Sequence, residues 1–147
     1  MIRIAGYEAK YFEGLVALLQ EWEHSSFDFS PVGVREQLAR LAAHKESRIF
    51  LAVDGDERVL GYALCEQRHL LGLQPFVEIV QLLVTEHGRG HGIGSALLRH
   101  VEELYGQAGA THARLHSRTE RTRAHALYER SGYKLYKTSK FYEKPLN

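Results

Sequence analysis

Residues 76–107 read FVEIVQLLVTEHGRGHGIGSALLRHVEELYGQ and decide the fold. The first nine, Phe76–Val84, carry apolar side chains on both alternating faces, which predicts a central strand covered on both sides. From Ile93 to Gln107 apolar residues recur at three- and four-residue spacing, the pattern of an amphipathic helix that ends near Gly109. Between the two, glycine occupies every second position over 88–94. We therefore predict a strand, a glycine-rich turn and a helix in immediate succession.

The glycine-rich turn is suited to holding an anion. Glycine permits positive φ and close approach to the backbone, and the first turn of a helix offers unpaired N–H groups at the positive end of its dipole. Two nucleotide-binding patterns are absent, because Ser95 stands where GxGxxG needs a third glycine and no Gly-Lys-Ser/Thr follows. A phosphate group is the expected ligand. A turn that serves only tight strand-to-helix geometry is the alternative.

Upstream of this stretch, the sequence predicts one strand, two helices and an antiparallel hairpin. In chain order these are a strand at Ile2–Ala5, a helix from Phe12 to Trp22, a helix capped by Ser30 and begun by Pro31, and strands at Arg48–Val53 and Arg58–Cys65 joined by the turn-prone Asp54–Glu57.

Downstream, the sequence predicts a strand at His112–Ser117 and a helix over Arg121–Ser131 that stops at Gly132. Tyr133–Lys144 is rich enough in Tyr, Phe and Leu for one or two closing strands. The predicted order is βααβββαβαβ. This order describes an α/β sandwich in which a mixed, mostly antiparallel sheet carries helices on both faces.

Composition limits the classes of partner. The 147 residues suit one domain, 1–147, and 19 Lys plus Arg against 18 Asp plus Glu give a net charge of +1, so no overall field favours nucleic acid or an anionic membrane. Without an apolar segment of signal or membrane-spanning length, a cytoplasmic location is expected. The single Cys65 is expected to be a buried structural thiol. Nine histidines lack a cysteine or carboxylate cluster, so no metal is expected.

Three segments resemble a known family. Arg89–Gly94, RGHGIG, resembles the Arg-x-x-Gly-x-Gly/Ala signature of the GCN5-related N-acetyltransferases (GNAT), and Ala124–Tyr133, AHALYERSGY, is similar to the second signature of that family. The ending Thr138–Leu146 also resembles the carboxyl end of the family. Together with the matching order of elements, the likeness covers nearly the whole chain. It implies an acetyl-coenzyme A dependent N-acetyltransferase that transfers the acetyl group directly, without a covalent enzyme intermediate.

The resemblance also implies which residues hold the cofactor. Residues whose backbone would hold the pyrophosphate of acetyl-CoA are Arg89, Gly90, His91, Gly92, Ile93, Gly94 and Ser95. Residues whose backbone would pair with the pantetheine arm are Leu82, Leu83 and Val84. This chain departs from the family's pattern at Arg121, where many members have Asn. It also has Thr85-Glu86 where a proline often follows the strand.

Two residues are candidates for proton transfer. Tyr128 stands at the tyrosine of the second signature, which in many relatives protonates the coenzyme A thiolate, and a neutral phenol suits that task. Its alternative role is core packing. Glu78 lies in an otherwise apolar strand, where desolvation would make its carboxylate a better base for the amine proton. A structural ion pair with a nearby Arg or Lys is the alternative for Glu78, and Gln81 could orient a water or the substrate.

The expected acceptor is a primary amine of a small molecule. Acidic and aromatic side chains alternate between the first two helices, and they suggest a cationic acceptor held by Glu21, Glu23 and Asp28 together with Trp22, Phe27 and Phe29. A solvated acidic helix end with core aromatics is the alternative. A non-catalytic acyl-CoA binding or sensing module on the same fold is the second functional reading. The closing strands could form the edge of a homodimer.

Overall fold

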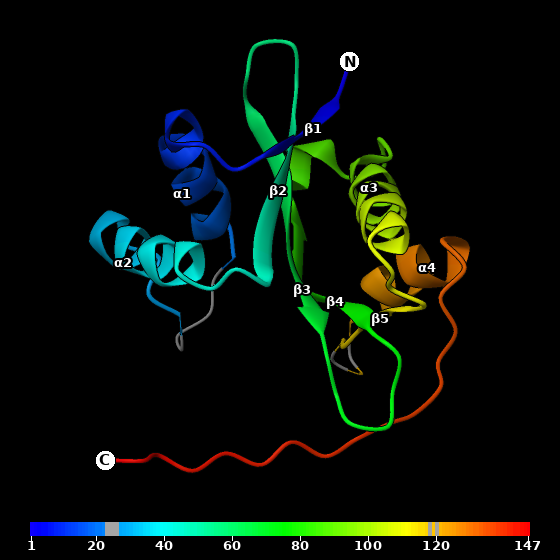
Figure 1. Ribbon diagram of the computed structural model, residues 1–147. Coiled ribbons are helices and arrows are strands. Elements are labelled where there is room, and N and C mark those ends of the chain that lie inside the picture. Colours follow the sequence, from blue (N-terminus) through cyan, green and yellow to red (C-terminus); the bar gives the residue numbers. More distant parts are fainter. Residues whose placement is uncertain (23–26, 118, 120) are drawn as a thin grey trace. The chain divides into compact units, whose positions relative to one another are not determined.

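Five strands form one sheet in the computed structural model of the chain, in the order β1-β2-β3-β4-β5 (Figure 1). The strands are β1 (Arg3–Gly6), β2 (Ser47–Val53), β3 (Val59–Arg68), β4 (Phe76–Val84) and β5 (Ala113–Leu115). The first three neighbouring pairs are antiparallel, and β5 runs parallel to β4. The predicted mixed, mostly antiparallel sheet is confirmed.

The structure describes residues 1–22, 27–117, 119 and 121–147. These residues form two compact units, 1–116 and 117–147. The whole sheet and three of the four described α-helices belong to the first unit, and the helix of the second signature belongs to the second.

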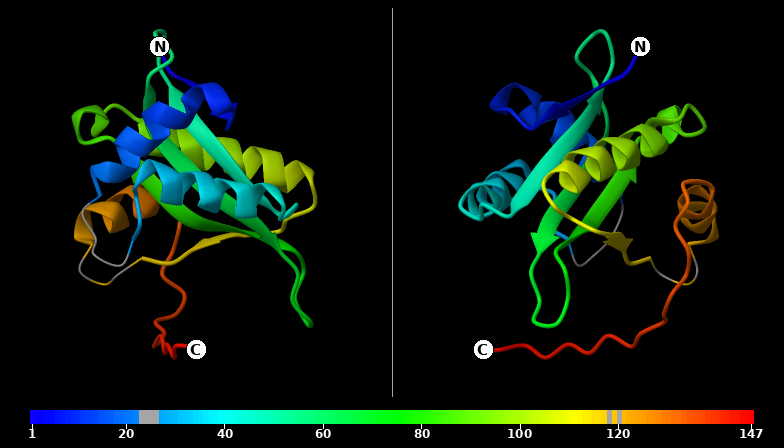
Figure 2. Two further views of the ribbon diagram at one scale, coloured as in Figure 1. Left: turned by 90° about the vertical axis from the view of Figure 1, so that its left-hand side faces the viewer. Right: turned by 45° about the vertical axis from the view of Figure 1, so that its right-hand side comes forward.

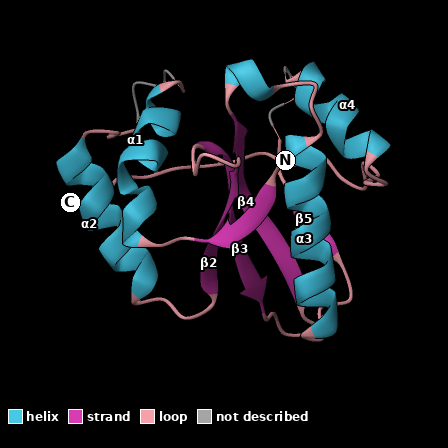
Figure 3. Cartoon of the chain, turned by 90° about the horizontal axis from the view of Figure 1, so that it is seen from above, coloured by secondary structure: helices cyan, strands magenta, loops and turns pink. Residues whose placement is uncertain are grey.

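Helices cover both faces of the sheet in the first unit, as Figures 1 and 3 show for α1 and α2 on one side and α3 on the other. They are α1 (Phe12–Gln20), α2 (Pro31–Ala42) and α3 (Ile93–Gln107). In Figure 2 the cyan helix α2 crosses in front of the strands that it covers. Two buried layers result, one on each face of the sheet.

Alternation along the strands fills these two layers. The layer under α1 and α2 is built around Leu51, Val53, Tyr62, Leu64 and Leu83, with Leu15, Leu18 and Val34 from the helices. On the other face Phe50 meets α3, since its ring lies 5.1 Å from that of His100 and 6.5 Å from that of Tyr105. Consecutive residues of one strand therefore serve opposite cores, which is the period of two that a strand imposes.

The predicted helix boundaries rest on local chemistry that the structure bears out. Ser30 is the N-cap of α2, its Oγ accepts a hydrogen bond of 3.1 Å from the N–H of Gly33, and Pro31 begins the helix. In the second unit, Gly132 follows α4 (Thr122–Arg130) with φ of +91°. Helix α3 spans the predicted residues 93–107.

Strand β4 has the predicted bounds and is an internal strand, with β3 and β5 as its neighbours. It is the fourth of five strands, and β3 lies in the middle of the sheet. A register shift opposite Leu64 and Cys65 leaves Val80 without a partner in β3, and Val80 is 42% exposed. The apolar run therefore corresponds to a strand that is mostly buried over its first half and more exposed beyond Ile79.

The expectation of closing strands over Tyr133–Lys144 is wrong. Residues 133–147 form neither helix nor strand, and large side chains of this segment are exposed, among them Leu135 at 86% and Tyr142 at 89%. Aromatic and branched residues favour a strand only where a neighbouring strand takes up their backbone hydrogen bonds. The described residues of the second unit contain one helix and no strand that could do so.

The single cysteine is a buried thiol, as the sequence predicts. Cys65 is 0% exposed, and burial raises the pKa of its thiol to about 12, with a small opposing effect of Arg48. It therefore stays protonated and unreactive at neutral pH. Among the described residues, no helix is both long enough and apolar enough to cross a membrane.

Replacing Leu97 by alanine should destabilise the protein by about 2–5 kcal/mol, because the side chain is 0% exposed and its loss leaves a cavity between α3 and the sheet. Leu71→Ala is the matched control, since Leu71 is fully exposed in the loop between β3 and β4. Urea unfolding of both variants measures the difference. Equal midpoints for the two variants would contradict the assignment of Leu97 to the core.

Candidate functional site

The glycine turn connects β4 to α3 and has the backbone that its sequence predicts. A short 3-10 turn over Glu86–Gly88 comes first, and then Gly90 and Gly92 take φ of +85° and +78°. A Cβ at either of these two glycines would meet nothing within 4 Å, so backbone conformation requires glycine there. At Gly88 crowding is the reason, because a Cβ would lie 2.6 Å from the Cδ1 of Ile93.

The first turn of α3 presents backbone N–H groups that have no acceptor. Gly92 is the N-cap, and the first backbone bond of the helix runs from the N–H of Ala96 to the Gly92 carbonyl at 3.0 Å. The N–H groups of Gly92, Ile93, Gly94 and Ser95 donate to no acceptor within the described residues. Unpaired donors at the positive end of a helix are groups to which phosphate oxygens can bind, so phosphate binding at these four residues stays a prediction.

The end of β4 adds a second group of unpaired backbone atoms. β5 pairs with β4 only over Val77–Ile79, so residues 81–84 have β3 on one side and no described strand on the other. An extended ligand can hydrogen-bond to such an edge as an added strand would. The three residues proposed to pair with pantetheine, 82–84, lie on this open edge, and the glycine turn follows them directly in the chain.

Glu21 fixes the segment between the open edge and the glycine turn. Its carboxylate accepts hydrogen bonds of 2.8 Å from the Oγ1 of Thr85 and 2.9 Å from the N–H of Glu86. Thr85 is 8% exposed, and its own N–H donates to the Leu60 carbonyl at 2.8 Å. Glu21, placed by the sequence reasoning in an acceptor loop, therefore uses both carboxylate oxygens to hold the glycine turn.

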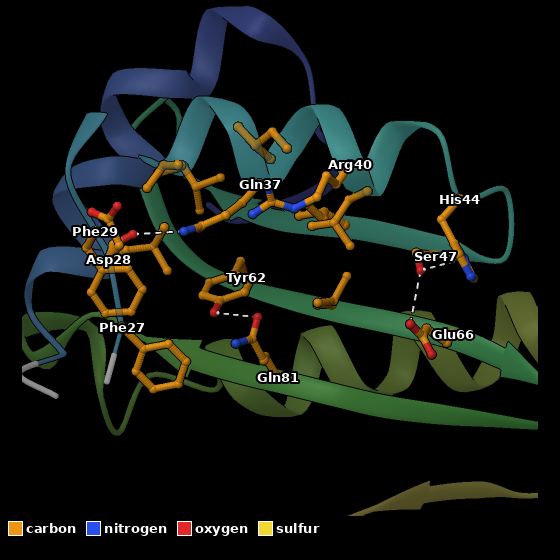
Figure 4. Close-up of a pocket in the computed structure, with 17 residues that line it drawn as sticks. Phe27, Asp28, Phe29, Gln37, Arg40, His44, Ser47, Tyr62, Glu66 and Gln81 are labelled. Atoms are coloured by element: carbon orange, nitrogen blue, oxygen red, sulfur yellow. Dashed lines mark hydrogen bonds between the residues drawn. The ribbon is translucent and has the colours of Figure 1, made fainter. Parts of the chain in front are cut away.

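A cavity of about 620 Å³ lies between α2 and the sheet, also within the first unit (Figure 4). Strands β3 and β4 supply Tyr62, Leu64, Glu66 and Gln81 to its wall. The Tyr62 hydroxyl donates to the Oε1 of Gln81 at 3.1 Å, and burial raises the pKa of Tyr62 so that this donor stays protonated. Gln81 thus faces the cavity on the strand whose edge is open, which fits the orienting role expected of it.

Aromatic rings close the cavity at the end toward α1. Phe27 and Phe29 line it and stack at 5.2 Å, and Trp22 lies 4.9 Å from Phe27. Asp28 lies between them in sequence and also lines the cavity, while its Oδ1 accepts from the N–H and Oγ of Ser30. These bonds lower the pKa of Asp28, so it stays ionised. Of the predicted acidic set, Glu23 lies outside the described residues.

Glu78 has two charged or chargeable neighbours. The Nη1 of Arg68 donates to its Oε1 at 2.9 Å, and the Nδ1 of His116 lies 3.4 Å from its Oε2. The residues that line the cavity do not include Glu78, although Arg68 also reaches Glu66, a lining residue, at 3.6 Å. This is the ion-pair arrangement that stood as the alternative for Glu78. Its role as the base stays a prediction.

Tyr128 lies in the second unit, on the last full turn of α4. Its ring meets that of Tyr133 edge to face at 6.4 Å, and the helix begins after Arg121, whose side chain does not cap it. Burial raises the pKa of the Tyr128 phenol, and Arg121 opposes the shift. The phenol is therefore neutral at pH 7 and carries the proton that a general acid needs. Its catalytic role stays a prediction from the motif.

One wall of the cavity consists of residues that the sequence does not mark as functional. Gln37, Arg40 and His44 line it from α2 and the turn that follows. Their spacing of three and four residues places them on one helical face, and that signal was present in the sequence. The spacing alone does not indicate a function, because only the folded chain shows that this helical face lines the same cavity as Tyr62 and Gln81.

The family assignment now rests on more than motifs. The model of the acetyltransferase (GNAT) family matches residues 13–133, and the chain belongs to this family. A curated relative, the aminoalkylphosphonate N-acetyltransferase of Salmonella typhimurium, is 40% identical over 84 residues, which are 57% of this chain. The match spans about half of that relative, 54% of its length.

Solved structures share the fold at low identity. A transcriptional regulator from Bacillus halodurans superposes with a TM-score of 0.86 at 20% identity, covering 97% of this chain and 100% of that one. The aminoglycoside 6'-N-acetyltransferase AAC(6')-Ih from Acinetobacter baumannii gives 0.80 at 18% identity over the whole of both chains. AAC(6')-Iy, in complex with the bisubstrate analogue CoA-S-monomethyl-acetylneamine, gives 0.82 at 16% identity over 99% of each chain. These likenesses establish the fold.

Replacing Gly92 by valine should weaken acetyl-CoA binding by about tenfold or more, because the side chain disfavours the left-handed conformation that presents the amides of the turn. Gly72→Val is the matched control: φ is +86° there, the space around its Cβ is equally open, and the loop lies at the start of β4. Calorimetry on both variants separates backbone strain from ligand contact. Equal affinities in the two variants would remove the glycine turn from the cofactor site.

Proposed function

We propose that the chain transfers the acetyl group of acetyl-CoA to the primary amine of a small molecule. The observation that carries this proposal is the row of unpaired N–H groups at Gly92–Ser95, which follows the open edge of β4 within a few residues of chain. A phosphate-bearing ligand with a long polar arm suits this combination. The cavity of about 620 Å³ gives room for a second, smaller substrate beside the same strand.

Within this proposal the backbone binds the cofactor. The amides at the start of α3 hold the pyrophosphate, and the open edge of β4 over 82–84 pairs with the amides of the pantetheine arm. Acetyl-CoA supplies an activated thioester. The residues present fit this cosubstrate, because their unpaired donors match its phosphate oxygens and their free strand edge matches its amide-bearing arm.

Transfer requires that the amine lose a proton and the thiolate gain one. The amine nitrogen forms a bond to the acetyl carbon while the carbon–sulfur bond breaks. Glu78, directly or through water, is the proposed acceptor of the amine proton, and Tyr128 the proposed donor to the departing sulfur. Cys65 is buried and protonated, so it supplies no thiolate for a covalent acyl-enzyme. Direct transfer is consistent with this.

The names of similar proteins support an amine acceptor of small size. The curated relative is an aminoalkylphosphonate N-acetyltransferase, and two of the structural neighbours are described as aminoglycoside 6'-N-acetyltransferases. Both substrate classes are small molecules with amino groups. They differ in charge, since aminoglycosides are cationic and aminoalkylphosphonates carry an acid.

One observation favours the second candidate, an acyl-CoA binding or sensing module. The carboxylate of Glu78 forms an ion pair with Arg68 and lies near His116. A carboxylate with a purely structural role would show the same arrangement. Such a module would bind acetyl-CoA through the same backbone groups and release no thiol.

The test is release of the coenzyme A thiol from acetyl-CoA in the presence of a panel of small primary amines. We expect amine-dependent release and a matching acetylated product by mass spectrometry. Tyr128→Phe keeps the ring and deletes the proton, so turnover should fall by about 100-fold while cofactor affinity is retained. Because Cys65 is buried, the protein itself contributes little to a thiol-reagent signal.

Two results would contradict parts of this account. Tight acetyl-CoA binding without thiol release by any amine would favour the sensing module. Wild-type turnover in Tyr128→Phe would assign that residue to packing and leave the acetyltransferase assignment standing.

A further inference from the structure

Two charged side chains of the cavity wall, Glu66 and Arg40, differ in whether they have a partner of opposite charge. Glu66 accepts from the Oγ of Ser47 at 3.1 Å and has Arg68 at 3.6 Å. Arg40 also lines the cavity, and within the described part of the chain its guanidinium has no hydrogen bond, ion pair or ring contact. The counter-charge of Arg40 must therefore come from solvent or from a ligand.

Asp28 is the matching carboxylate at the other end. Its Oδ1 accepts from Ser30 and its carboxylate lies beside Gly33 in the first turn of α2, but no described cation pairs with it. In Figure 4 Asp28 lies with the phenylalanines at one end of the cavity, and Arg40 stands farther along α2 toward His44. Asp28 and Arg40 thus both line the cavity, and neither has an ion-pair partner among the described residues.

Hydrogen bonds fix the wall around Arg40. Gln37, one turn earlier on α2, donates its Nε2 to the Asp28 carbonyl at 3.0 Å. His44, one turn later, has its Nδ1 3.1 Å from the Oγ of Ser47, which in turn donates to Glu66. Hydrogen bonds therefore hold Gln37 and His44, the neighbours of Arg40 on this helical face, while the guanidinium of Arg40 has no partner in the described part of the chain.

We propose that Arg40 binds an anionic group of the acceptor, so that the substrates are small amines that also carry a phosphonate, phosphate or carboxylate. This inference rests on the proposed acetyltransferase function and names the substrate class of that site. A guanidinium presents a planar fork of N–H donors that matches the oxygens of such acids. Asp28 would attract the ammonium form of the amine on entry.

This substrate class differs from the cationic acceptor that the acidic residues of the sequence suggest. Two changes account for the difference. Both carboxylate oxygens of Glu21 already accept hydrogen bonds, from Thr85 and Glu86. Arg40 adds a positive charge to the cavity wall, and this charge repels a polycation. A ligand that carries both signs satisfies Asp28 and Arg40 together.

The experiment compares acceptors that differ in one charged group. Phosphoethanolamine, aminomethylphosphonate and β-alanine test three acids, ethanolamine is the uncharged match, and putrescine is the cationic one. We expect kcat/KM for the best acidic amine to exceed that for ethanolamine and putrescine by about tenfold or more, the effect of one charge-assisted hydrogen-bonded pair. The order among the three acids identifies the anion.

Variants of α2 then test the residue itself. Arg40→Gln should lower kcat/KM for the acidic amine by about tenfold, mainly through KM, and leave ethanolamine within about twofold. Arg40→Lys should recover only part of the loss, because a lysine lacks the fork. Arg35→Gln is the matched control, since Arg35 lies on the same helix over the Phe12 ring, outside this cavity, and should leave both kinds of acceptor unchanged.

Each contrary result has a distinct meaning. Equal kcat/KM for acidic and uncharged amines, a preference for putrescine, or an Arg40→Gln variant that keeps wild-type selectivity would overturn this inference while the acetyltransferase function stands. Failure to acetylate any amine in the panel would overturn the proposed function, and this inference with it. Circular dichroism of each variant checks that the fold is retained.

Discussion

Glu21 accepts two hydrogen bonds, from the Thr85 hydroxyl and the Glu86 N–H. These bonds join the end of α1 to the segment between β4 and the glycine turn, and the rest of the candidate site depends on this connection. Glu21 directly follows the last turn of α1, and Trp22 comes next in the chain. Thr85 directly follows the open end of β4 and precedes the glycine turn. The Glu21 carboxylate therefore connects the end of α1, where the loop toward the cavity begins, to the segment that precedes the proposed cofactor-binding amides. Its loss would leave the buried Thr85 hydroxyl without a partner.

Much of the fold could be predicted because its signals are local. The bounds of β4 and α3 follow from apolar periodicity, and the start of α2 follows from Ser30 and Pro31. The strand predicted after Gly132 fails for the opposite reason. A strand needs a neighbouring strand to pair with its backbone N–H and C=O groups, and the sequence of residues 133–144 does not show whether such a neighbour is present.

The candidate site divides in the same way. The glycine turn could be found from sequence, since positive φ and unpaired amides are properties of a few consecutive residues. The cavity could not, because its wall combines residues of α2 with residues of β2, β3 and β4 that are far apart in the sequence. Carboxylates show the limit most clearly. Glu21 and Asp28 look alike in the sequence, yet Glu21 accepts hydrogen bonds from Thr85 and Glu86, whereas Asp28 accepts from Ser30 and lines the cavity.

Backbone groups, more than side chains, carry the proposed binding of acetyl-CoA, and amide hydrogen exchange measures those groups directly. We predict that coenzyme A slows exchange of the amides of Gly92–Ser95 and of the outward-facing amides among 82–84, which lack partners in the described chain. Amides of Val77–Ile79, already between β3 and β5, should change little. Saturating coenzyme A that protects neither the glycine turn nor the end of β4 would contradict the account.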